Sequence, residues 1–65
     1  MTHKTVLLKF KLLFPQYAGT MTQWFPNGDN SVRVRFHQHR NDMIFTYNSM
    51  KDWKLETVDS FIKSM

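Results

Sequence analysis

A chain of 65 residues with nine Lys or Arg against five Asp or Glu, a formal charge of +4, has room for one small domain, residues 1–65, with a thin core. Hydrophobic residues make up 42% and aromatic residues 15%, which excludes a disordered chain, and the lack of cysteine excludes disulfides and favours a cytoplasmic location. The basic charge favours an anionic partner such as nucleic acid, although many small domains carry such a charge for solubility alone.

Residues 4–14 predict a β-strand. Apolar side chains alternate there with a row that contains Thr5, Lys9 and Lys11; the apolar row is Val6, Leu8, Phe10, Leu12 and Phe14. A period of two is typical of a strand with one buried face, and a strand keeps both lysines in water, where a helix would place them among apolar residues. Because the lysines also interrupt the apolar run, we expect neither a signal peptide nor a membrane span, and no membrane partner.

Residues 20–25 and 31–39 predict the two strands of a β-hairpin, because a dense turn signal that contains Asn27-Gly28 separates them. With a two-residue loop at Asn27-Gly28, Trp24 would lie opposite Ser31 and on the face away from the core. A change of one residue in the loop would move Trp24 to the other face, so both placements stay open.

Residues 42–48 predict the next strand. A two-residue loop at Arg40-Asn41 would pair Phe36 with Phe45 and join two apolar rows on one face. A longer loop would pair Phe36 with Thr46 instead. Burial of a Phe side chain contributes roughly 1.5–3 kcal/mol, which favours the register that joins the aromatic rows.

The C-terminal segment has two interpretations. The favoured one is a helix over residues 50–64, with Ser49 and Asp52 in the pattern of a capping box and a helical stripe formed by Leu55, Val58, Phe61, Ile62 and Met65. The other is a short strand over residues 53–57 before a shorter helix capped by Thr57. We therefore expect an α+β fold, an antiparallel sheet of three to four strands (about 4–14, 20–25, 31–39 and 42–48) with one C-terminal helix packed on one face.

One face of this predicted sheet collects basic side chains, and a cationic surface with an aromatic side chain is what nucleic-acid binding needs. The leading hypothesis is a small non-enzymatic intracellular module that contacts nucleic acid through this face, with Trp24 stacking on bases. Its predicted site residues are Lys9, Lys11, Arg33, Arg35, His37 and Trp24. The same row of charges is also common on strands that bind nothing, where it keeps a sheet soluble and protects its edges.

The alternative hypothesis is a protein-interaction or inhibitor module, of the kind that phages and mobile elements encode, acting through Trp24, Tyr17 and a sheet edge. Edge strands and a thin core also predict a homodimer. No cofactor or metal is expected, because His37 and His39 supply two ligands where a zinc site takes three or four. No nucleophile motif or paired carboxylates indicate an enzyme.

Overall fold

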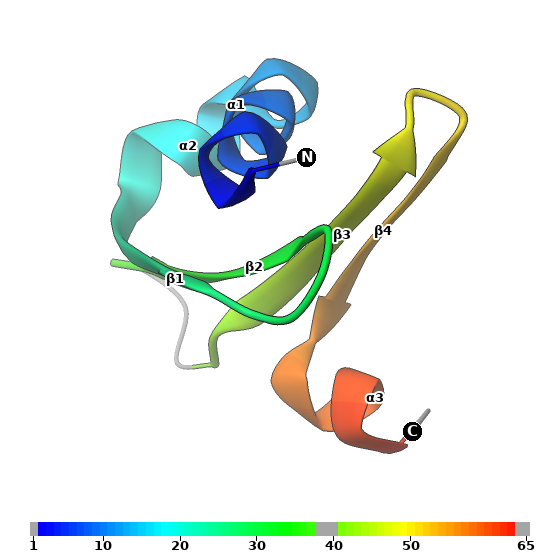
Figure 1. Cartoon of the computed structure of the whole chain (residues 1–65). Helices are drawn as coiled ribbons and strands as arrows, with labels where there is room; N and C mark the ends of the chain where they lie inside the picture. The colour runs from blue at the N-terminus through cyan, green and yellow to red at the C-terminus, as the bar shows by residue number, and fades with distance from the viewer. Residues whose placement is uncertain (1, 38–40, 64–65) are drawn as a thin grey trace.

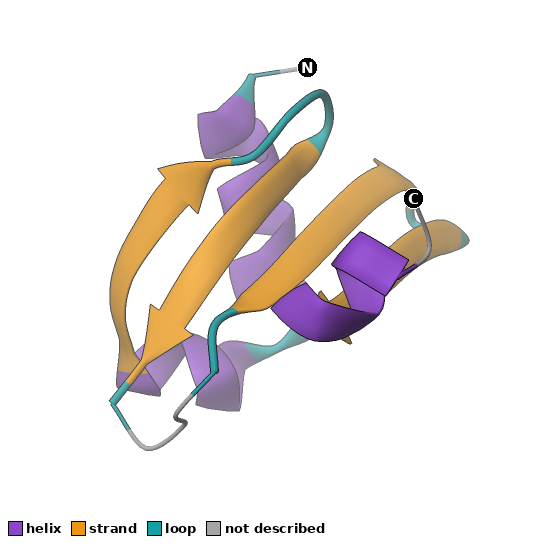
Figure 2. Cartoon of the chain, turned by 90° about the horizontal axis from the view of Figure 1, so that it is seen from below, coloured by secondary structure: helices purple, strands orange, loops and turns teal. Residues whose placement is uncertain are grey.

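A computed structural model describes residues 2–37 and 41–63, which form one antiparallel sheet with helices on both of its faces (Figure 1). The strand order is β1-β2-β3-β4, with α1 and α2 on one face and α3 on the other (Figure 2). The α+β class and the antiparallel sheet are confirmed. The elements are α1 (His3–Leu13), α2 (Pro15–Thr20), β1 (Met21–Pro26), β2 (Ser31–Phe36), β3 (Met43–Ser49), β4 (Asp52–Thr57) and α3 (Val58–Lys63).

The N-terminal segment is a helix, so the strand predicted over residues 4–14 is wrong. Thr2 caps α1, because its side-chain oxygen accepts a hydrogen bond from the backbone N–H of Thr5 at 3.2 Å. Pro15 then starts α2, where its missing N–H costs nothing.

The helix keeps its lysine side chains out of the core, which the alternating pattern did not lead us to expect. It buries Val6, Leu7 and Phe10, which share one helical face, and leaves Leu8 and Leu12 59% and 71% exposed. No lysine is buried among apolar residues. The desolvation cost that counted against a helix is therefore avoided, because two leucines face solvent instead.

The turn between β1 and β2 is longer than two residues. It spans residues 27–30, with Gly28 and Asn30 at φ angles of 69° and 58°, a region that Gly and Asn tolerate better than other residues. As a result Trp24 lies opposite Val34 rather than Ser31. Trp24 is therefore on the face that α1 covers, packed against the core.

The pairing of β2 with β3 also differs from the predicted register. Phe45 lies opposite Val32 instead of Phe36, and β2 ends at Phe36 rather than at residue 39. The slide is four positions, an even number, so every side chain of these two strands keeps its predicted face. The connection covers residues 37–42, of which residues 38–40 lie outside the described part of the chain.

The C-terminal segment follows the second interpretation. The predicted C-terminal helix is present, but it begins at Val58, so the helix start predicted at residue 50 is wrong. Residues 52–57 form β4, which pairs with β3, and α3 follows with Thr57 as its cap. The Thr57 side chain accepts a hydrogen bond from the N–H of Ser60 at 3.1 Å. As a strand, this segment packs Leu55 against the core and sets the ring of Trp53 edge-on to Phe14, at 5.3 Å between centroids.

The core lies between α1 and the central strands, and Phe10 is at its centre. This side chain is 0% exposed, and its ring centroid lies 5.6, 6.1 and 5.5 Å from those of Phe14, Phe36 and Phe45. Ile44 is also buried, but it does not pack in this core. Its side chain points to the opposite face of the sheet, on the side of α3. The sheet therefore has one face filled by α1 and one face partly covered by α3.

Candidate functional site

The outer face, by which we mean the sheet face turned away from α1, carries the basic residues of β2. Successive side chains of a strand point to opposite faces, so burial of Val32 and Val34 against α1 places Arg33 and Arg35 on the outer face. On the neighbouring strand β1, Phe25 lies opposite Arg33 and Gln23 lies opposite Arg35.

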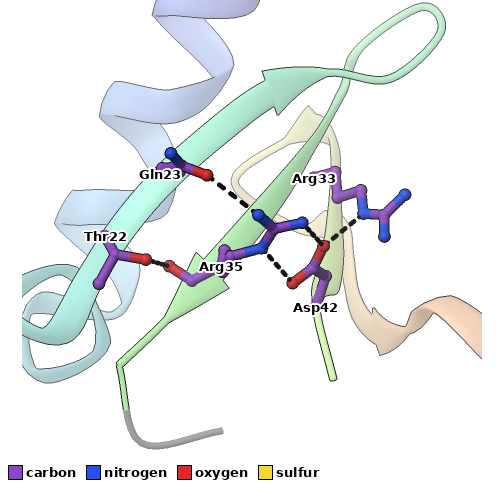
Figure 3. Close-up of polar contacts among 5 residues, drawn as sticks. All are labelled: Thr22, Gln23, Arg33, Arg35 and Asp42. Atoms are coloured by element: carbon purple, nitrogen blue, oxygen red, sulfur yellow. Dashed lines mark hydrogen bonds and ion pairs between the residues drawn. The ribbon is translucent and has the colours of Figure 1, made fainter. Parts of the chain in front are cut away.

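A single carboxylate, that of Asp42, joins the two arginines (Figure 3). Asp42 lies at the end of the connection before β3 and is buried. Its Oδ2 accepts a hydrogen bond from Nε of Arg33 at 2.6 Å, and both of its oxygens accept from Arg35, at 3.1 Å from Nε and 3.2 Å from Nη2. The bidentate geometry with Arg35 is the stronger form of this interaction.

All three nitrogens of the Arg35 side chain donate to neighbouring side chains. Besides Asp42, its Nη1 donates to the side-chain oxygen of Gln23 at 3.0 Å, and its guanidinium carbon lies 5.3 Å from the ring centroid of Phe25. The hydrogen bond and the charge of Asp42 raise the pKa of Arg35 above its ordinary value. Arg35 therefore acts as a fixed part of the outer face, with its charge compensated locally.

The pKa of Asp42 moves in the opposite direction. The hydrogen bond from Arg35 lowers it below the ordinary value, and this effect outweighs the rise caused by burial. The hydrogen bond and charge of Arg33 lower it further. Asp42 is therefore ionised at neutral pH, and the cluster of two arginines and one carboxylate has a charge of +1.

Arg33 retains more free donors than Arg35. Only its Nε bonds Asp42, and its two terminal nitrogens point away from the carboxylate, with no hydrogen bond to any residue that the structure describes (Figure 3). Its side chain is 43% exposed. It borders an open pocket of about 370 Å³, which is lined by Arg33, Arg35, Asn41, Asp42, Val58 and Asp59.

The structure does not bring all of the predicted site residues together. Lys9 and Lys11 lie on α1, on the other side of the sheet, and the ammonium group of Lys9 is 5.9 Å from the ring centroid of Tyr47. Trp24 packs against the core on that same side. Of the six predicted residues, only Arg33 and Arg35 share the outer face of β2; His37 is exposed just beyond the end of the strand.

Two contributors to the outer face were not predicted from the sequence. Phe25 is 38% exposed and lies on the face that was predicted for Trp24, because the longer turn changes the register of β1 against β2 by three positions, an odd number. Asp42 was not among the predicted site residues. The sequence does contain a signal for it. Arg33 and Arg35 alternate along one strand, and Asp42 is an acidic residue just after the turn that follows this strand, from where its side chain can reach both arginines.

These observations define the chain as a small α+β domain with an antiparallel sheet, whose outer face presents an arginine-rich cluster at β1 and β2. The chain matches no protein-family model, and no curated protein and no solved structure resembles it significantly. The function must therefore be argued from the outer face itself.

Two further properties concern the described residues, 2–37 and 41–63. Within them no helix is long and apolar enough to span a membrane. They also contain no group of three or more His, Cys, Asp or Glu side chains placed to hold a metal ion. His39, the second residue of the His pair that was considered as a metal ligand, lies outside the described residues.

Proposed function

We propose that this chain is a non-enzymatic binding module that contacts single-stranded nucleic acid through the outer face at β1 and β2. The observation that carries the proposal is the position of Arg33. It lines an open pocket, its terminal guanidinium nitrogens point away from Asp42, and it lies opposite Phe25 in the pairing of β1 with β2. A phosphate needs such donors, and an unpaired base needs an aromatic or guanidinium surface on which to stack.

The other residues of the cluster hold these two groups in place. Asp42 fixes Nε of Arg33, and Arg35 lies against Phe25 while it is held by Asp42 and Gln23. Side chains that are ordered before binding lose less conformational entropy when a ligand arrives. The cluster therefore offers one phosphate contact and one stacking surface that are already formed.

This interface is smaller than the one predicted from the sequence. Lys9, Lys11 and Trp24 leave it, and the charge of Arg35 is compensated by Asp42. The remaining charged contacts to phosphate are one or two, from Arg33 and from Lys54 as an outlying cation. For a single strand this number predicts a slope of log K against log salt of about −0.7 to −1.4.

Arg33→Gln and Phe25→Leu are expected to weaken binding in different ways. Loss of one phosphate contact should weaken binding of a labelled single-stranded 12-mer about fivefold to tenfold at low salt and reduce the salt slope by about 0.7. Loss of the stacking surface should weaken binding by a similar factor or more and leave the slope unchanged. Fluorescence anisotropy across a salt series measures both quantities.

Lys11→Gln is the matched control, because it removes one positive charge from α1, on the other side of the sheet. It should leave the affinity within about twofold. Absence of binding at low salt would refute the proposal. So would an equal loss of affinity in Lys11→Gln and Arg33→Gln, since that result means non-specific attraction to the whole basic chain.

The alternative function, protein interaction, loses part of its predicted surface. Trp24 packs against the core, and the ring of Tyr17 lies against those of Phe14 and Phe36, at 5.8 and 5.7 Å between centroids. What remains of that surface is the sheet edge and the exposed part of Tyr17, which is 43% exposed. A cytoplasmic location and a phage-type origin remain predictions from size and composition, and a homodimer remains a prediction from the edge strands and the thin core.

A further inference from the structure

The two edges of the sheet differ in how well they are protected against a further strand. The β1 edge carries a register irregularity between Met21 and Gln23 and ends in Pro26, and both features hinder the addition of a strand. In β4 the pairing with β3 is regular from Trp53 to Thr57, and the strand contains no proline or glycine. The β4 edge is thus the one that can accept a partner.

The direction of the β4 backbone groups follows from the hydrogen bond that ends the strand. Val58 N–H donates to the carbonyl of Asp42 at 3.3 Å, which makes the facing pair Thr57 and Met43 a non-hydrogen-bonded pair. Because the two kinds of pair alternate, the backbone N–H groups of Trp53, Leu55 and Thr57 point away from β3. These groups form the open edge.

We propose that β4 pairs with the β4 strand of a second copy, antiparallel and centred on Leu55, so that two four-stranded sheets join into one. The two Leu55 residues would exchange two backbone hydrogen bonds, and each Thr57 N–H would donate to the Trp53 carbonyl of the other copy. A two-fold axis through the Leu55 pair makes the contact closed and self-complementary, as in most homodimers.

Charge selects this register. With Leu55 opposite Leu55, each Lys54 lies opposite Glu56 of the other copy, so the outer face gains two pairs of opposite charge. A slide by two residues one way sets Lys54 against Lys54, and a slide the other way sets Glu56 against Glu56. Both alternatives oppose like charges, which disfavours them.

The apolar side of the strand fits the same arrangement. Leu55 and Trp53 point to the face that α1 covers, where Leu55 is half-buried and Trp53 is still 37% exposed. In the dimer the two Leu55 side chains would lie side by side, with the two Trp53 rings flanking them. The core of each copy would then continue across the two-fold axis. The further burial of these apolar side chains would stabilise the dimer.

Charge reversal tests the register directly. Sedimentation equilibrium of the wild-type chain is expected to show a species of twice the 7.9 kDa monomer mass at high concentration. Lys54→Glu or Glu56→Lys alone should weaken dimerisation by about tenfold or more, because each places like charges in both cross-strand pairs. The double variant Lys54→Glu/Glu56→Lys should recover the dimer, and an equal mixture of the two single variants should form a heterodimer.

Lys51→Glu is the matched control, since it makes the same charge change in the turn between β3 and β4 and should dimerise like the wild type. Amide hydrogen exchange gives an independent measurement, in which the Leu55 N–H should exchange more slowly as concentration rises. The proposal is overturned if the wild-type chain stays monomeric up to about 1 mM. It is equally overturned if the double variant dimerises no better than the single variants.

Discussion

Replacement of Phe10 by alanine is expected to leave the chain largely unfolded. The side chain is 0% exposed and contacts the rings of Phe14, Phe36 and Phe45, so truncation leaves a cavity that the helix and sheet cannot close without moving apart. Such a change costs about 3–5 kcal/mol, whereas the core of a domain this small rarely supplies more than about that amount. Urea denaturation followed by circular dichroism measures the loss.

Leu12→Ala is the control for this prediction, because Leu12 is 71% exposed on the opposite side of α1. Its free energy of unfolding should change by less than about 0.5 kcal/mol. A strand over residues 4–14 would place Leu12 and Phe10 in the same buried row and make both changes costly. A large loss in Leu12→Ala would therefore contradict the position of α1.

Asp42→Asn is expected to lower the free energy of unfolding at neutral pH by about 1–2 kcal/mol. The variant removes the charge that Arg33 and Arg35 share and turns an amide donor toward their guanidinium donors. The cost stays at the low end for a buried charge, because the arginine side chains are 43% and 47% exposed and water screens them. Urea denaturation of both proteins gives the difference.

Asp59→Asn is the matched control, since Asp59 is exposed and borders the same pocket without an ion pair among the described residues. It should change the free energy of unfolding by no more than about 0.5 kcal/mol. An equal loss of unfolding free energy in both variants would mean that stability depends on the total charge around the pocket. The ion pairs of Asp42 would then make no specific contribution.

The contribution of Asp42 should also depend on pH. Its pKa in the folded chain is lowered from the ordinary 3.8, so the unfolded chain binds more protons as the solution becomes acidic. The stabilisation is complete above about pH 5 and is lost as the pH falls towards the lowered pKa. The difference in unfolding free energy between wild type and Asp42→Asn should thus shrink between about pH 5 and about pH 2. A constant difference over this range would contradict the ion pairs.

The faces of the central strands could be predicted from the sequence, because they depend only on a period of two. Val32, Val34 and Phe45 lie on the buried face as predicted, although the register of β2 against β3 is displaced by four positions. An even displacement preserves every face, so the prediction that Arg33 and Arg35 point outward did not require the correct register.

The N-terminal helix could not be predicted in the same way. Leu7, Leu8, Leu12 and Leu13 supply apolar residues for both periods, so a strand and a helix each find a continuous apolar row. The helix is the more stable structure because it packs Phe10 against Phe36 of β2 and Phe45 of β3. These are tertiary contacts, which a local sequence pattern does not predict.

The candidate site was predicted in part for a related reason. Whether Trp24 or Phe25 reaches the outer face depends on the length of one turn, and a single residue reverses the answer. The role of Asp42 depends on the path of the chain after β2, which brings a distant carboxylate back to Arg33 and Arg35. Neither feature has a periodic signal in the sequence.

The strand order β1-β2-β3-β4 has a consequence for how fast the chain reaches this structure. Every strand pairs with its neighbour in the sequence, across connections 27–30, 37–42 and 50–51, so the sheet can grow by closing short loops one after another. The docking of α1 brings together residues much farther apart along the chain. We expect the hairpins to form early and the arrival of Phe10 to limit the folding rate, because that step alone closes a long loop.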